Sequence, residues 1–190
     1  MKRVSALLLV ASFFLVFGAA PARAEVTLTP FIGSLFSGDL PNAKADYGAS
    51  ATFMGGGIFG AEILFNYAPR FVPASTVSPA VAQAGLMGNL VIGVPIGGDA
   101  GKSIKPYVTG GIGLFRATAK KDDFFDRVTS NDFAYNLGGG VMAFFNDHIG
   151  LRGDLRYVRT LRDDNDDSGI LFEPGSLNFW RWNVGPSFRF

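Results

Sequence analysis

The side chains that could do chemistry in this chain are charged groups at every second position of otherwise apolar segments. Arg152, Asp154 and Arg156 follow one another at this spacing, and Glu62 stands between apolar neighbours in another segment. Alternate side chains of a β-strand share a face, so such segments present charge on one side and hydrocarbon on the other. The polar side is predicted to collect Glu62, Arg152, Asp154, Arg156, Arg181 and Arg189, with the amides of Asn66, Asn89, Asn136 and Asn183.

Two kinds of site could be built from this polar set. If the strands close into a barrel, the set faces a shared interior, where buried charges must pair. A paired set would be a salt-bridged plug, whereas a hydrated set would line a narrow gated pore. An eight-stranded barrel is only wide enough for its own side chains to fill it. We therefore favour the plug.

A catalytic site would depend on His148, the only histidine of the chain. A histidine beside a serine, often with an acidic partner, can activate a nucleophile. His148, however, follows Asn146 and Asp147 in a predicted tight turn, which favours a solvated polar role. We predict that the protein is not an enzyme, and that it has no catalytic residue and no cofactor.

The acidic run 163–167 is the one candidate for a divalent cation, because such ions prefer oxygen ligands. The run lacks the fixed glycine and the bidentate glutamate of a calcium-binding helix–loop–helix. A solvated loop held in water by self-repulsion is the favoured interpretation, and no metal residues are predicted. The net charge of +1 gives no field to attract nucleic acid.

Period-two alternation places these residues on strands at eight positions along the chain. The predicted strands cover residues 26–36, 47–54, 58–68, 80–96, 105–118, 132–145, 149–161 and 177–190. Their connections alternate strictly between long loops, at 37–46, 69–79, 120–131 and 162–176, and short turns. Strands with one apolar face, of about the 9–11 residues that span hydrocarbon, cross a membrane only as a closed barrel. The fold class predicted is all-β: an eight-stranded antiparallel up-and-down transmembrane β-barrel.

The beginning of the chain has the pattern of a cleaved secretory signal peptide at 1–24. Lys2 and Arg3 precede an apolar segment, and Ala22 and Ala24 form a small-x-small cleavage site. We expect the barrel domain to cover 25–190. The absence of cysteine fits export without establishing it.

The last eight residues carry the most specific pattern. Asn183, Gly185, Phe188 and Phe190 are spaced like the C-terminal assembly signal of bacterial outer-membrane barrels, which this segment resembles. The segment at 105–114 is similar to the Pro-Tyr-x-x-x-Gly-x-Gly strand of the outer-membrane β-barrel domain family. The chain as a whole resembles the small barrels of the OmpA and OmpX type. Pro186 departs from a regular strand, because proline cannot donate to the ladder.

This resemblance implies a protein of the bacterial outer membrane that reaches it through the periplasm. Its expected partners are outer-membrane lipids, lipopolysaccharide and the barrel-assembly machinery, and a monomer is expected. The leading interpretation is a non-catalytic structural or surface-interaction protein that acts through four extracellular loops, with an unknown extracellular partner. The alternative is a binding or transport barrel for small molecules. A hydrophobic ligand would need a lateral opening or an apolar upper lumen, against which the inward arginines and aspartate argue. A secreted barrel of lipocalin type would instead invert the two faces.

Overall fold

The computed structural model describes residues 24–40, 42–72, 81–97, 102–120, 127–161 and 177–190, and all regular structure in them is β-strand. No helix in these residues is long and apolar enough to span a membrane. The strands are β1 (Ala24–Phe36), β2 (Lys44–Gly55), β3 (Phe59–Val72), β4 (Val81–Gly93), β5 (Ser103–Lys120), β6 (Arg127–Phe144), β7 (Ile149–Leu161) and β8 (Asn178–Arg189).

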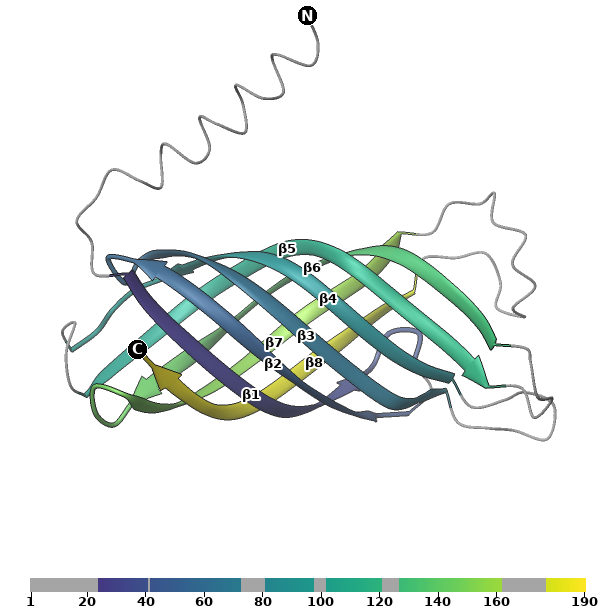
Figure 1. Ribbon diagram of the computed structural model, residues 1–190, viewed down its shortest axis with the longest axis horizontal. Coiled ribbons are helices and arrows are strands. Elements are labelled where there is room, and N and C mark those ends of the chain that lie inside the picture. The colour runs from purple at the N-terminus through teal and green to yellow at the C-terminus, as the bar shows by residue number, and fades with distance from the viewer. Residues whose placement is uncertain (1–23, 41, 73–80, 98–101, 121–126, 162–176) are drawn as a thin grey trace, which may run out of the picture.

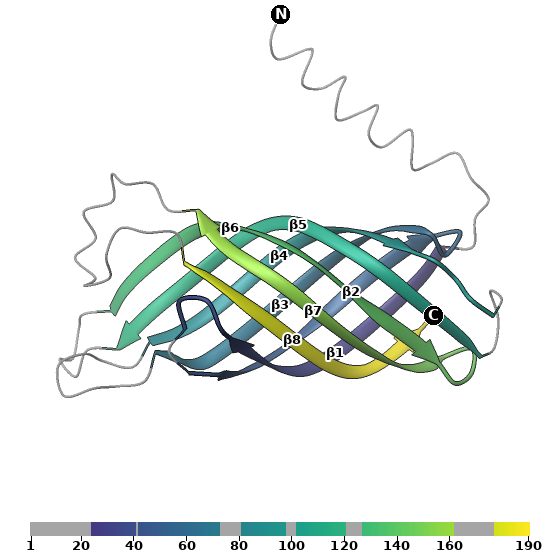
Figure 2. The same cartoon turned by 180° about the vertical axis from the view of Figure 1, so that it is seen from behind.

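The strands form one closed barrel in which each strand pairs with its sequence neighbours and β8 pairs with β1. All pairs are antiparallel, and the tilt of the strands around the barrel is visible in Figures 1 and 2. The predicted fold class is therefore confirmed. Closure removes the sheet edges that would otherwise be exposed to lipid.

The two faces of the strands are the ones expected from the alternation. Along β7 every second residue is buried, from Gly150 to Thr160, and the residues between them are exposed or partly exposed. Large apolar side chains cover the outside, with Ile63 57% and Leu155 45% exposed. Such a surface is suited to hydrocarbon and unsuited to water, so the inverted, lipocalin-like arrangement is excluded.

The two ends of the barrel differ in their connections. At one end, here the turn end, β2 and β3 are joined through Gly56 and Gly57, whose φ values of 59° and 71° favour glycine. The connections between β1 and β2, β3 and β4, β5 and β6, and β7 and β8 lie at the other end, here the loop end (Figure 1). The predicted strict alternation of long and short connections is wrong, because the β4–β5 connection at the turn end, residues 94–102, is longer than every loop-end connection except the one between β7 and β8. In outer-membrane barrels the long loops lie outside the cell.

Several predicted boundaries were wrong because the strands continue beyond the predicted hydrocarbon span. Residues 44–46 and 69–72 belong to β2 and β3 rather than to loops. β5 and β6 are 18 residues each, and their pairing runs as far as Lys120 and Arg127. β4 is the opposite case, because it is shorter than predicted and ends at Gly93 rather than at residue 96. Backbone pairing within a hairpin needs no apolar alternation, so the periodicity fades before the strand ends.

Candidate functional site

Glu62, on β3, is an acceptor at the centre of a charged network in the lumen. Its Oε1 atom accepts hydrogen bonds from Arg156 Nη1 and Asn89 Nδ2, each at 2.8 Å. Its Oε2 atom accepts from Arg156 Nη2 at 3.3 Å and from Thr52 Oγ1 at 3.4 Å. The same oxygen forms an ion pair with Arg152 Nη2. Glu62 therefore binds two guanidinium groups at once.

Asp154, on β7, is the second acceptor of the network. Its Oδ1 atom accepts from Arg156 Nε and Asn183 Nδ2, each at 2.9 Å. Its Oδ2 atom accepts from the Tyr107 hydroxyl at 2.8 Å and from Arg152 Nε at 3.2 Å. Each carboxylate thus meets both arginines, and two negative charges are balanced by two positive charges.

This lumen network, defined as Glu62, Arg152, Asp154 and Arg156, spans the barrel interior. β3 and β7 lie four places apart in the closed order of eight strands, so they stand on opposite walls. Arg152 and Glu62 are 1% exposed and Arg156 is 0% exposed. Charges so buried are tolerated only when paired and hydrogen-bonded, which is the arrangement here.

The two other arginines of the predicted set lie apart from this network. The guanidinium of Arg181 is buried 6.0 Å from the ring of Phe31, and no carboxylate of the described chain lies within ion-pair distance of it. Arg189 lies at the turn end, where its Nε donates to the Asp147 carbonyl at 2.7 Å. Both share the inward phase with the network, and Arg181 on β8 is the cross-strand partner of Arg156 on β7.

Sequence reasoning missed two further charged residues of the lumen. Lys105 is 3% exposed, and its Nζ lies 2.7 Å from Glu25 Oε2. Asp46 is fully buried and accepts a hydrogen bond from Asn66 Nδ2 at 2.9 Å. Lys105 is two residues from Tyr107, which points inward. The alternation of the strand therefore predicts that Lys105 points inward as well. Asp46 falls at the end of the predicted loop 37–46, which carries no phase.

The loop end of the lumen is filled by apolar side chains, which contradicts the expectation of an interior without an apolar upper part. The expectation failed because Glu62, Arg152, Asp154 and Arg156 gather in one network, whereas the inward positions nearer the loop end are mostly apolar, with Asp46 of β2 as a buried exception. The upper apolar cluster consists of Phe31, Leu35, Leu40, Leu64, Ala68, Phe71, Met87, Phe115, Ala134, Val158 and Phe179. Phe179 makes edge-to-face contacts with Phe71 and Phe115, each at 5.9 Å.

The residues of the predicted assembly signal are divided between the two faces of β8. Asn183 and Gly185 point inward and are buried, whereas Phe188 and Phe190 point outward. Phe190 is 74% exposed, and its backbone exchanges hydrogen bonds with Val26 of β1, at 2.9 and 3.4 Å. The aromatic residues of the signal thus lie at the turn end of the barrel, where β8 pairs with β1.

Neither a catalytic site nor a metal site is formed by the predicted candidates within the described part of the chain. His148 lies exposed in the β6–β7 turn, where its backbone amide donates to Asn146 Oδ1 at 2.9 Å. No group of three or more metal-ligating side chains is found among the described residues. The acidic run 163–167 and the predicted signal peptide lie outside the described residues, apart from Ala24, which begins β1.

A closed barrel with an apolar exterior and ion pairs in its lumen defines a β-barrel membrane protein of the bacterial outer membrane. Residues 6–190 match the family model described as the outer membrane protein beta-barrel domain. The chain belongs to this family.

Solved structures of other outer-membrane barrels share the fold. The N-terminal β-barrel domain of OprF from Pseudomonas aeruginosa is 14% identical with a TM-score of 0.58, covering 89% of this chain and 99% of that one. Neisserial surface protein A is 11% identical with a TM-score of 0.61, covering 87% and 95%. The attachment invasion locus protein Ail of Yersinia pestis, in complex with a heparin analogue, is 12% identical with a TM-score of 0.55, covering 88% and 99%. No curated protein sequence matches the chain.

Proposed function

We propose that this protein is a non-catalytic outer-membrane barrel with a closed lumen, which acts as a structural or surface-interaction protein through its extracellular loops. The observation that carries the proposal is the lumen network, in which Glu62 on one wall binds Arg152 and Arg156 on the other. A path for ions or solutes along the barrel axis would have to break these contacts. Function would then depend on the connections at the loop end.

The upper apolar cluster supports a closed lumen independently. Its members are 0–8% exposed, so they fill the lumen between the lumen network and the loop end. Two of the similar barrels are named for the cell surface and for attachment, respectively. At these identities the likeness extends to the fold alone, so a surface role remains our proposal.

Conductance in a planar bilayer tests the closed lumen. Wild-type protein should pass little or no steady current, because paired side chains fill the interior. Glu62→Ala should destabilise the barrel rather than alter ion selectivity. A large, stable wild-type conductance, with selectivity changed by Glu62→Ala at unchanged stability, would make the protein a channel.

A second candidate is a barrel that binds or transports small hydrophobic molecules. The upper apolar cluster favours it, because a hydrophobic ligand needs apolar surface above the charged network. Calorimetric titration of the protein in detergent with a fluorescent apolar dye discriminates the two functions. Saturable binding that is lost in Phe179→Asp but retained in Phe145→Asp, on the outer surface, would favour this candidate.

A further inference from the structure

Two prolines face each other across the seam where β1 and β8 close the barrel. Leu28 pairs with Phe188 and Ile32 pairs with Val184, so the same register places Pro30 opposite Pro186. Between these two pairs the ladder has no partners, whereas it continues beyond them in both directions. The interruption is therefore local and coincides with the prolines.

The alternation of the antiparallel ladder shows what is lost at this point. Val26 and Phe190 exchange both of their backbone hydrogen bonds. In an antiparallel pair every second position repeats this exchange, so the pair formed by Pro30 and Pro186 is such a position. Proline has no N–H, and hence neither bond can form. The carbonyl groups of both prolines have no backbone donor across the seam, in a region where a membrane supplies no water.

The seam is instead held by side chains and by close contact. On the lumen side, the hydroxyl groups of Thr29 and Ser187 are hydrogen-bonded at 2.8 Å. Gly185 lies so close to Pro30 that a Cβ atom added to it would collide with the Pro30 carbonyl oxygen. One hydroxyl pair thus takes the place of two backbone hydrogen bonds.

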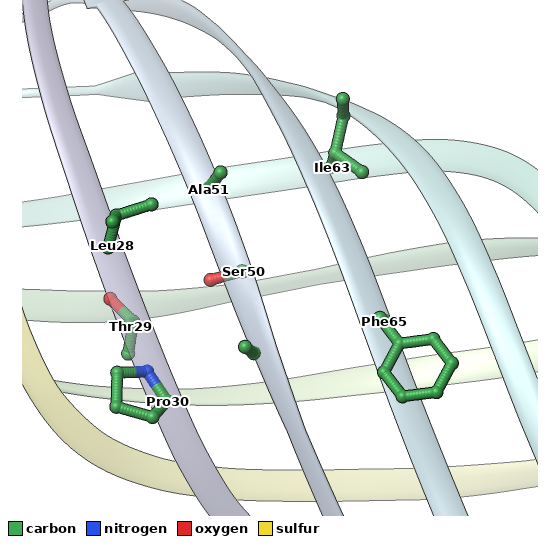
Figure 3. A pocket seen from close by; sticks show the side chains of 8 residues that line it. Leu28, Thr29, Pro30, Ser50, Ala51, Ile63 and Phe65 are labelled. Atoms are coloured by element: carbon green, nitrogen blue, oxygen red, sulfur yellow. The ribbon is translucent and has the colours of Figure 1, made fainter.

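Apolar surface lies on both sides of this weak point. Phe31, the inward neighbour of Pro30, belongs to the upper apolar cluster. Outside, a hollow crosses β1, β2 and β3, where the small side chain of Ala51 lies between those of Leu28 and Ile63 (Figure 3). Ala49 also lines this hollow. Pro30 and Leu28 form its border on β1. A linear hydrocarbon chain fits the hollow, because no lining residue is charged, and it fits the cluster, whose members are all apolar. Arg181 is the nearby charge on the lumen side, 6.0 Å from the ring of Phe31.

We propose that the β1–β8 seam is a lateral entry site, at which an acyl chain from the membrane separates the two prolines and reaches the upper apolar cluster. Opening at this position breaks the Thr29–Ser187 hydroxyl bond but no backbone hydrogen bond between Pro30 and Pro186. The site does not depend on whether the lumen conducts, since it lies in the wall of the barrel. It also differs from the surface role proposed for the loops.

Two buried serines provide a test, because Thr29 lies between them. They differ in one contact, since Ser50 Oγ also accepts a hydrogen bond from Arg152 Nη1 at 3.2 Å, and a nearby positive charge would speed rather than slow the labelling of a thiol at position 50. Ser187 faces Thr29 across the seam, and Ser50 pairs with Thr29 across the continuous β1–β2 ladder. Ser187 is 0% exposed and Ser50 is 4% exposed. The chain contains no cysteine, so Ser187→Cys and Ser50→Cys each introduce a single thiol.

Each variant, folded in lipid vesicles, is treated with N-dodecylmaleimide, which partitions into the membrane, and in parallel with a charged water-soluble maleimide. Rates are normalised to those of the protein unfolded in urea. The lipophilic reagent should label Ser187→Cys roughly tenfold faster than Ser50→Cys, a factor expected from two missing hydrogen bonds. Adding Pro30→Ala and Pro186→Ala restores both donors and should remove the difference. Each single proline replacement should give an intermediate rate.

Equal protection of the two thiols would overturn the proposal. So would faster labelling of Ser187→Cys by the water-soluble reagent alone, which would place the access route at an open end of the barrel. An unchanged rate after both prolines are replaced would show that the prolines do not weaken the seam. If the double replacement does not fold, the two single replacements provide the same comparison.

Discussion

Arg156 reaches across the barrel from β7 to Glu62 on β3, and its Nη1 and Nη2 atoms lie 2.8 and 3.3 Å from the two carboxylate oxygens. The same guanidinium donates from Nε to Asp154, two residues away on its own strand, at 2.9 Å. Arg156 thus connects the acid of one wall with the acid of the other. Loss of either acid leaves a buried positive charge in excess.

Glu62→Ala should therefore destabilise the barrel by about 3–5 kcal/mol, because Arg152 and Arg156 lose a shared partner in a dry interior. Urea unfolding in lipid vesicles, followed by tryptophan fluorescence, measures the loss. Asp166→Ala, in the connection between β7 and β8, is the control and should have little effect. Equal stabilities of the two variants would mean that the lumen network is dispensable for folding.

Lysine on the outer face should lower the free energy of unfolding, by an amount that depends on the depth of the residue in the membrane. Ile63 and Leu155 are exposed on the apolar exterior, on β3 and β7. Ile63→Lys and Leu155→Lys should each cost about 2–4 kcal/mol if the positions lie near the bilayer midplane. The same unfolding titration applies, with Asp147→Lys in the exposed β6–β7 turn as control. No cost at either position would show that this face does not contact hydrocarbon.

The sequence predicted the barrel because a period of two survives wherever one face meets lipid. Arg152, Asp154 and Arg156 were assigned to the lumen by phase alone, and the structure places all three there. Phase could not predict which charges meet, since this depends on register around a closed sheet. Arg156 and Arg181 are paired neighbours on β7 and β8, yet only Arg156 reaches a carboxylate.

The interior of the loop end was harder to predict for a different reason. Phe31 and Leu35 point inward, while Leu28 and Ile32 on the same strand point outward, so β1 has apolar residues on both faces. A strand of this kind loses its alternation and carries no phase signal. The irregular pairing expected from Pro186 was found, but its opposition to Pro30 requires the register of the seam.

Phe190 should be required for assembly, and the structure adds a second reason to the signal pattern. Its backbone closes the turn end of the seam through two hydrogen bonds with Val26. Deletion of Phe190, or Phe190→Asp, should lower the folded barrel in the outer membrane and leave periplasmic precursor. Heat-modifiable migration on gels of membrane fractions measures the folded form.

The control variant is Phe145→Asp, which removes another exposed aromatic residue at the turn end and should assemble better than Phe190→Asp. Wild-type levels of folded Phe190 variants would contradict the signal assignment.

Gly185→Ala should prevent regular closure of the barrel, because no side chain fits between β8 and β1 at this position. An added Cβ would collide with the Pro30 carbonyl oxygen and lie 2.9 Å from Phe31 Cα, and both are backbone atoms that cannot turn aside. The matched control is Gly153→Ala on β7, where the nearest atom to an added Cβ, the Asn183 carbonyl oxygen, is 3.8 Å away. The yield of folded protein after dilution from urea into vesicles compares the two. Gly185→Ala should fold poorly and unfold at lower urea, whereas Gly153→Ala should match or slightly exceed wild type, since alanine restricts the unfolded chain more than glycine. Equal folding of both variants would show that β1 and β8 lie farther apart than this structure places them, and the lateral entry site would then lack its close contact.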